Sequence, residues 1–338
     1  AGSLDRTLLI GVLCIVWCTY AFDPAPTRLR ALLNDGKCHL MPCCFDGLSA
    51  RVISQHEAGF NVTFMTGFGV AGSYGFADQG IVSGSENYER SRMIGEALAN
   101  ARTVERFTKG VERPPLPCIA DGDTGYGGAA SIRRTIFSYG RAGMAGVMIE
   151  DQLSPKRCGH VDGKDVVGFE EAVRRVRAAC SARDEFETQT GMPGPLILAR
   201  TDARGSLTFA GEDGFKEAVR RTQAFRDVGA DILFLESPRS REEMVSWCAT
   251  VEGPKLYNAL EGGKTPILGR EELEEIGFSL AAYPLTLLSA AAKAMNEALD
   301  RIGSGEEVDD MILGFDELKS VVGFDDNRML EEEFMKEL

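Results

Sequence analysis

The sequence predicts an α/β protein, and more specifically a (β/α)8 barrel, from three observations. Short apolar runs alternate with amphipathic stretches from residue 39 onward, which is typical of parallel strands joined by right-handed helical crossovers. Eight such units fit into the chain before residue 285. Polar and acidic residues follow the apolar runs, as expected at the functional face of a barrel. The alternative is an open doubly wound sheet, but the sequence has no GxGxxG motif after its first strand and no P-loop.

The predicted strands and helices alternate in order along the chain. The strands are His39–Cys44, Asn61–Thr66, Pro117–Asp121, Gly146–Glu150, Leu196–Arg200, Asp231–Glu236, Lys255–Asn258 and Phe278–Ala282. β-Branched residues support five of these eight assignments. The helices between them are Leu48–Ala58, Glu86–Thr108, Ser131–Ala142, Phe169–Thr188, Gly211–Val228 and Ser240–Val251. Two more helices are predicted after the last strand, Leu285–Arg301 and Glu306–Leu338, of which the second is highly acidic. They are expected to serve packing or oligomerisation, the alternative being a solvated charged face.

Three segments are expected along the chain: a leader at residues 1–24, a barrel domain at residues 25–303 and an acidic helical tail at residues 304–338. Residues 8–22 are almost wholly apolar, too short to cross a membrane comfortably but suited to the core of a signal peptide. Residues 19–26 resemble the cleavage context of bipartite sequences for algal complex plastids. This interpretation places the protein in a plastid or another organelle. A buried N-terminal helix or an uncleaved anchor is the alternative, with the protein then in the cytoplasm or a mitochondrion.

Composition excludes several classes of protein. A net charge of −14 without any basic stripe argues against binding to a nucleic-acid backbone. The nine cysteines form no paired C-x-x-C pattern, which fits a reducing compartment better than a disulfide framework. The three histidines, at positions 39, 56 and 160, lack metal-ligand spacing, so a zinc site is not expected. The many carboxylates instead suit a hard cation such as Mg²⁺.

A cysteine in a polar loop follows the predicted strand that ends at Glu150. Lys156, Arg157 and His160 surround Cys158 in sequence, and they are expected to lower the thiol pKa towards neutrality. Such a thiol is useful as an acid, base or nucleophile. The alternative is a buried structural cysteine, which a loop of this polarity does not favour.

Three carboxylates follow two neighbouring predicted strands. Asp121 and Asp123 lie two positions apart in a glycine-rich turn, and Glu150 ends the next strand. Together they could hold Mg²⁺, or Mn²⁺, mainly through water molecules, leaving positions for a substrate. The alternative for any single Asp-Gly pair is a turn capped by its own aspartate.

Further residues that follow predicted strands could bind a carboxylate or support a residue that does. Arg200 directly follows an apolar strand, and its planar fork could bind a carboxylate, although an ion pair with Asp202 or Glu236 is the alternative. Residues 66–69 offer backbone N–H groups to an anion in a flexible turn. Asn258 could donate a hydrogen bond to a carboxylate, the alternative being a turn residue. Glu236 orients Arg200 or pairs with Arg239 or Arg241.

Five motifs together resemble the isocitrate lyase/phosphoenolpyruvate mutase superfamily over residues 27–303. They are Asp-x-Asp-Thr-Gly-x-Gly from residue 121, Ile-Glu-Asp-Gln from 149, Lys-Arg-Cys-Gly-His from 156, Ala-Arg-Thr-Asp from 199 and Tyr-Pro-Leu from 283. The resemblance implies a β/α barrel with a C-terminal helix exchanged between neighbours, a homotetramer built as a dimer of helix-swapped dimers, and Mg²⁺. It also implies a small carboxylate substrate and chemistry at a bond next to a 2-oxo acid.

The resemblance also implies roles for individual residues. Asp121, Asp123 and Glu150 would form the Mg²⁺ shell, with Asp78 near a metal-bound water. Cys158 would be the acid on a mobile loop, with Lys156 and His160 beside it and Arg200 on the metal-bound oxygen of the substrate. The substrate-binding residues implied are Thr66, Gly67, Phe68, Arg157, Gly159, Glu236, Asn258 and Thr265.

Within the superfamily, the cysteine loop implies the lyase branch, and the absence of a large insertion makes the chain most similar to short lyases of the 2-methylisocitrate lyase type. These include 2,3-dimethylmalate lyase and oxaloacetate hydrolase. Phe64 and Phe68 depart from the lyase pattern by replacing polar or small residues, whereas Pro284 retains it where oxaloacetate hydrolases have serine. The expected reaction is Mg²⁺-dependent cleavage of 2-methylisocitrate or a 2-alkylmalate to pyruvate or another 2-oxo acid plus succinate or an alkyl-succinate. The alternatives are oxaloacetate hydrolysis and a catalytically silent scaffold subunit.

Overall fold

The computed structural model describes residues 22–110, 113–160, 163–209 and 211–336. The predicted leader therefore lies outside the described residues, apart from its last three positions. Over the described ranges, no helix combines the length and apolar character needed to cross a membrane.

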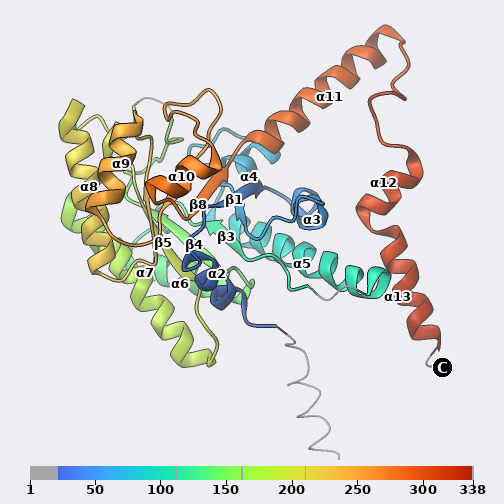
Figure 1. The fold of residues 1–338 in the computed structure, drawn as a ribbon, viewed down its shortest axis with the longest axis horizontal. Coiled ribbons are helices and arrows are strands. Elements are labelled where there is room, and N and C mark those ends of the chain that lie inside the picture. The colour runs from blue at the N-terminus through green and yellow to red at the C-terminus, as the bar shows by residue number, and fades with distance from the viewer. Residues whose placement is uncertain (1–21, 111–112, 161–162, 210, 337–338) are drawn as a thin grey trace, which may run out of the picture.

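Eight parallel strands form the predicted barrel (Figure 1). They are β1 (His39–Cys44), β2 (Thr63–Met65), β3 (Cys118–Asp121), β4 (Gly146–Glu150), β5 (Leu196–Thr201), β6 (Ile232–Leu235), β7 (Leu256–Asn258) and β8 (Leu280–Tyr283). Neighbours in sequence pair with each other, and β1 also pairs with β8. A parallel bridge between Leu233 and Lys255 joins β6 to β7 and completes the ring. The open-sheet alternative is therefore wrong.

Helices follow the strands at the predicted places. They are α3 (Gly47–Gln55), α5 (Gly84–Lys109), α6 (Ala129–Arg141), α7 (Phe169–Thr190), α8 (Gly211–Asp227), α9 (Arg241–Thr250) and α11 (Thr286–Ser304). Three short helices were not predicted: α2 (Ala25–Leu33), α4 (Gly67–Ser73) and α10 (Arg270–Ile276). The last two span only two turns each, too short for a helical hydrophobic period to be recognised.

The core has two layers because successive residues of a strand point to opposite sides of the barrel wall. One layer fills the barrel and includes Met41, Ile119 and Leu198, together with Leu29 and Leu33 of α2. The other layer packs strand residues such as Val147 and Ile197 against the surrounding helices. The polar strand ends are thus held at one rim of a rigid wall.

The C-terminal region differs from its prediction. The expected single helix Glu306–Leu338 is two helices, α12 (Phe315–Val322) and α13 (Phe324–Lys336), because Gly323 adopts a positive φ of 95° that ends the first. Figure 1 shows α11 leaving the barrel and α12 and α13 turning back beside α5. Arg51 of α3 fixes this return, since it pairs with Asp326 and its Nε donates to the Val321 carbonyl at 2.6 Å.

Candidate active site

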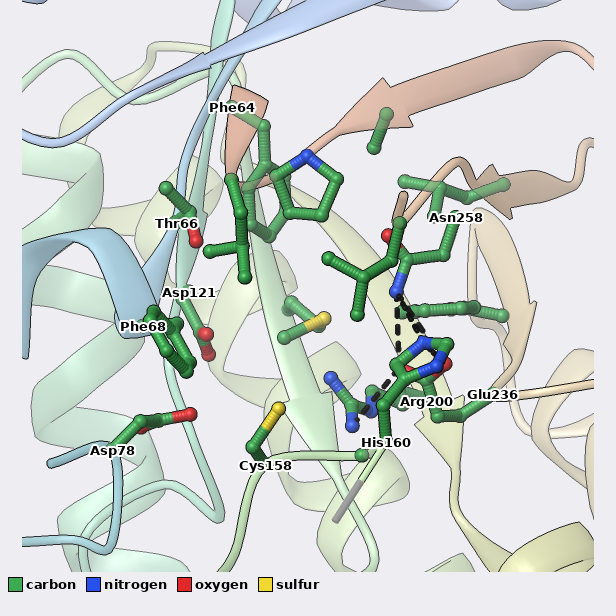
Figure 2. Close-up of a pocket in the computed structure, with 18 residues that line it drawn as sticks. Phe64, Thr66, Phe68, Asp78, Asp121, Cys158, His160, Arg200, Glu236 and Asn258 are labelled. Atoms are coloured by element: carbon green, nitrogen blue, oxygen red, sulfur yellow. Dashed lines mark hydrogen bonds and ion pairs between the residues drawn. The ribbon is translucent and has the colours of Figure 1, made fainter. Parts of the chain in front are cut away.

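A cavity of about 70 Å³ lies where the strands end. Figure 2 shows the Cys158 sulfur pointing into it, with Asp78, Phe68 and Asp121 on one side and His160, Arg200 and Glu236 on the other. Thr66, Gly159 and Asn258 also line it. These residues lie at or after the ends of six strands, β2 to β7, so the barrel brings together positions as far apart in sequence as 66 and 258.

The first part of the site is the loop after β3. Asp121 Oδ2 accepts the Gly67 N–H at 3.2 Å, and Asp121 Oδ1 accepts the Asp123 N–H at 2.9 Å. Asp123 has a positive φ of 48°, so the chain turns sharply and Asp123 does not continue the strand. Burial and then the charge of Asp123 raise the pKa of Asp121 to about 6. Two buried carboxylates this close require a cation.

Lys156 supplies that cation in this structure. Its Nζ lies 2.6 Å from Asp78 Oδ1 and also pairs with Asp123. Although burial opposes a charge there, the surrounding aspartates raise the pKa of Lys156 well above its ordinary value. Among the described side chains, no three His, Cys, Asp or Glu groups converge as a ready-made metal cage.

Glu150 completes the predicted set of carboxylates. It is buried, its Oε1 has no hydrogen-bond partner within the described chain, and burial raises its pKa well above the ordinary value. An orphaned carboxylate oxygen beside two aspartates is a donor set that fits a hard cation bound partly through water. It does not fit a soft metal, which would prefer sulfur or imidazole ligands.

Arg200 makes both of its alternative ion pairs. Asp202 accepts from Nε at 2.8 Å and from Nη2 at 3.0 Å, and Glu236 Oε2 lies 3.0 Å from Nη2. Glu236 therefore orients Arg200. The suggested pairing of Glu236 with Arg239 or Arg241 is not seen, because Arg241 pairs with Glu272 and the Arg239 N–H donates to Glu243.

The expectation for the Cys158 pKa was wrong. Burial raises the pKa of this thiol above its ordinary value. The neighbouring cations do not offset burial, because the Lys156 ammonium points at Asp78 and Asp123 and the Arg157 side chain is exposed outside the cavity. The thiol therefore keeps its proton at neutral pH, which suits an acid rather than a nucleophile.

His160 holds the cysteine segment against the barrel. Its Nδ1 accepts the Lys264 backbone N–H at 3.0 Å, so its proton lies on Nε2, which is 3.0 Å from Glu236 Oε1. Burial opposes the charge of Glu236, but Arg200 and His160 hold its pKa well below the usual range. Gly159 packs so closely on Arg200 and Glu236 that a side chain at this position would collide with both.

Thr66, Gly67 and Phe68 form the start of a helix rather than a flexible turn. Thr66 caps α4, and its Oγ1 accepts the Gly69 N–H at 3.4 Å. The Gly67 N–H is already used by Asp121, whereas Phe68 reaches the cavity. Gly67 therefore allows a close approach to Asp121 and does not itself line the cavity, because a side chain there would collide with the Asp121 carboxylate.

Much of the cavity wall is apolar, which the sequence indicated only at Phe64, Phe68 and Pro284. The further apolar lining residues are Met148, Phe234, Leu256, Leu260, Ala282 and Leu285. Thr265 is buried but does not line the cavity, and its Oγ1 has no hydrogen-bond partner in the described part of the chain. Two residues near the site were also missed: Gln152, whose side-chain amide bonds both the N–H and the carbonyl of Arg157, and Lys164.

Comparisons with known proteins agree on one family. The sequence model described as Phosphoenolpyruvate phosphomutase matches residues 29–303. A 2,3-dimethylmalate lyase of Eubacterium barkeri is 35% identical over 311 residues, which cover 91% of this chain and 97% of that protein. A Corynebacterium glutamicum protein named "Probable 2-methylisocitrate lyase 2" is 38% identical over 284 residues, covering 83% and 82%. The structure of an oxaloacetate acetylhydrolase with the inhibitor 3,3-difluorooxalacetate matches with a TM-score of 0.79, 33% identity and coverage of 92% and 98%.

Proposed function

This chain belongs to the phosphoenolpyruvate mutase/isocitrate lyase superfamily, and on that premise we propose that it is a Mg²⁺-dependent carbon–carbon lyase acting on a 2-hydroxy di- or tricarboxylate. The observation that carries the proposal is one cavity that Cys158, Arg200 and Asp121 line together, with Glu150 ion-paired to Arg200 at 3.4 Å. The two relatives named as lyases, at 35% and 38% identity, support this branch of the family.

The substrate is held by opposite ends of the cavity. Arg200 offers a guanidinium fixed by Asp202 and Glu236, and Thr66 and Phe68 face it from the start of α4. Asn258, which lines the cavity, and the buried Thr265 would contact a second carboxylate of the substrate. Gly159 and the exposed Arg157 belong to the segment that covers the site.

Asp121, Asp123 and Glu150 would hold Mg²⁺, with Asp78 beside them. When bound, the ion would stabilise negative charge developing on the C2 oxygen of the substrate. The same four carboxylates already surround the Lys156 ammonium or lie next to it, so the chain maintains positive charge at this place. Arg200 contributes further positive charge toward the same oxygen.

Cleavage of the C2–C3 bond converts the C2 end into a 2-oxo acid as the C2 hydroxyl proton passes to Glu150 Oε1, a buried carboxylate oxygen with no hydrogen-bond partner among the described residues. The bonding electrons pass to the other half and form an enediolate of its carboxylate. Cys158 then gives its Sγ–H proton to the carbon of this enediolate, producing succinate from 2-methylisocitrate or acetate from a 2-alkylmalate. A buried thiol that keeps its proton is suited to this step.

The closed cysteine segment protects this intermediate from water. Lys156 and His160 tie the segment to opposite sides of the cavity, through Asp78 and Asp123 on one side and Glu236 on the other. Exclusion of water limits protonation by solvent and strengthens every charge interaction inside.

The apolar wall favours a substrate with an alkyl substituent. Phe64, Phe68 and Leu260 offer contact surface but no hydrogen-bond donor. A 2-alkylmalate or 2-methylisocitrate should therefore be preferred over isocitrate, with one methylene worth about 1–3 kcal/mol in such a pocket.

Hydrolysis of oxaloacetate is the second candidate, favoured by the similarity to an oxaloacetate acetylhydrolase at 33% identity. Pro284 lines the cavity and offers no hydroxyl group. Oxaloacetate should therefore be a poor substrate, and Pro284→Ser should raise its turnover if that position decides between the two reactions.

We also propose a homotetramer built from helix-swapped dimers. Helix α11 has no buried residue, and Met295, Leu299 and Ile302 are exposed along one of its faces. A second copy of the chain is the partner that would cover them. Leu299→Glu should then lower the mass measured by light scattering.

For residues 8–22 we propose a targeting role, supported by their apolar sequence alone. A fusion of residues 1–30 to a fluorescent protein should locate to an organelle.

Binding of products separates a lyase from a silent scaffold. Ligands that bind only the folded protein raise its melting temperature. We expect Mg²⁺ with pyruvate and succinate to raise it, and chelation to abolish both this shift and turnover. If Mg²⁺ with pyruvate and succinate does not raise the melting temperature, the scaffold interpretation is favoured.

A further inference from the structure

One buried lysine near the site takes no part in the proposed reaction. The Lys164 side chain has an exposed fraction of 0%, and its Nζ donates to the Gly159 carbonyl at 2.5 Å and to Asp202 Oδ1 at 2.6 Å. The Lys164 carbonyl accepts the Leu207 N–H at 3.0 Å, so its own main chain is also fixed. A lysine is rarely buried to this degree without a carboxylate partner.

Both partners of Lys164 lie directly beside groups that act in the proposed reaction. Gly159 directly follows Cys158 in the segment that covers the cavity. Asp202 is the carboxylate that accepts two hydrogen bonds from the Arg200 guanidinium. A single ammonium group therefore joins the acid's segment to the carboxylate that orients the arginine.

A second connection runs from His160 through Glu236 to Arg200, but it does not involve the Gly159 carbonyl or Asp202. Among the described residues, the other donor to the Gly159 carbonyl is the Ser237 hydroxyl, at the longer distance of 3.4 Å. Without Lys164, Asp202 would remain buried against Arg200 with one cation fewer, and the Gly159 carbonyl would lose its charge-assisted donor. Lifting the segment must likewise break the bond from Lys164 to Gly159.

We propose that Lys164 is a positioning residue that couples closure of the Cys158 segment to the orientation of Arg200. The acid and the guanidinium then reach their working positions together. This inference rests on the proposed function for the roles of Cys158 and Arg200, but the contact itself can be tested without any substrate.

The experiment compares Lys164→Met with wild type and with Lys255→Met. Lys255 is a matched control because it is also buried and its Nζ donates to a carbonyl, that of Gly253, at the opposite end of the barrel. In substrate-free protein, iodoacetamide labelling of Cys158 is followed by mass spectrometry of its peptide. We expect Lys164→Met to increase the labelling rate about tenfold or more, as expected when one charge-assisted hydrogen bond no longer holds the closed state. We also expect kcat/KM to fall by about 100-fold, the scale of a 1 Å misplacement.

Labelling of Cys158 at the wild-type rate in folded Lys164→Met would overturn the proposal, whatever its activity. If Lys164→Met does not fold, Lys164→Gln is judged by the same labelling rate. Lys255→Met should leave labelling and turnover unchanged, and an equal increase in this control would also contradict a specific role for Lys164. If wild type releases no 2-oxo acid from any 2-hydroxy acid substrate, the proposed function fails while the labelling result still decides the coupling.

Discussion

At the scale of single residues, the environment of Cys158 decides what its thiol can do. Burial raises its pKa, and the Lys156 ammonium and the His160 imidazole beside it are engaged with carboxylates on opposite sides of the cavity. The thiol thus remains protonated and points into the cavity (Figure 2). This arrangement fits the role of proton donor that we propose for Cys158.

Replacing the donor should separate chemistry from binding. Cys158→Ser preserves the shape of the side chain but offers a far weaker acid, so kcat should fall by about 10²–10⁴-fold. The dissociation constant for pyruvate, measured by calorimetry, should change little. Cys248→Ser is the control, since Cys248 is a partly buried cysteine on α9 away from the cavity. Wild-type turnover in Cys158→Ser would show that another group is the acid.

Asp121 should make metal binding depend on pH. Its pKa is raised to about 6, so the folded carboxyl holds its proton more tightly than the unfolded one. Its contribution in the metal-free protein therefore favours folding at low pH and is lost as the pH rises through about 6. Mg²⁺ binds the ionised form and should stabilise the protein more above that pH than below it.

Melting temperatures with Mg²⁺ and with a chelator, measured on both sides of this pH, test the expectation. Asp121→Asn cannot ionise and should lose most of the Mg²⁺-dependent gain at either pH. A gain in wild type that is equal at low and neutral pH would contradict the role of Asp121 as a metal ligand.

At the scale of elements, the two C-terminal helices depend on a few contacts with the barrel. Arg51 of α3 binds the Val321 carbonyl at the end of α12 and the Asp326 carboxylate at the start of α13. The glycine between these helices sets the angle at which they return.

Arg51→Ala should release α12 and α13 while the barrel stays folded. We expect limited proteolysis to cut between residues 305 and 323 faster in this variant, with a melting temperature close to that of wild type. Arg30→Ala on α2 is the control, because its ion pair with Asp231 joins other elements and is half exposed. Equal cleavage of wild type and Arg51→Ala would show that other contacts hold these helices.

The sequence predicted the elements that have strong patterns. All eight strands were found because near-continuous apolar runs are typical of buried parallel strands. Helices α4 and α10 were missed because they are short, and the α12–α13 break was missed because a glycine inside an acidic stretch can also lie within a helix.

The site residues that could be predicted are those that lie at or after the end of a strand. Asp121, Glu150, Cys158 and Arg200 were located from their positions in the chain, and they surround or adjoin the cavity. The raised pKa of Cys158 could not be predicted, because burial of the loop depends on tertiary contacts. The pairing of Lys164 with Asp202 spans 38 positions and has no local pattern.

At the scale of the whole molecule, the barrel brings Cys158, the guanidinium of Arg200 and a carboxylate cluster to one rim. The apolar wall between them has no counterpart in the sequence pattern beyond Phe64, Phe68 and Pro284. The apolar character of this wall should decide which substrate the protein accepts.

The most direct test is oxo-acid release by the purified protein with Mg²⁺ from a panel of 2,3-dimethylmalate, 2-methylisocitrate, isocitrate and oxaloacetate. A 2-alkylmalate or 2-methylisocitrate should give the highest kcat/KM, because the pocket gains about 1–3 kcal/mol per buried methylene. The same panel with excess chelator should give no product. A highest value for oxaloacetate or isocitrate would contradict the substrate assignment, and no oxo acid from any member would contradict the lyase itself.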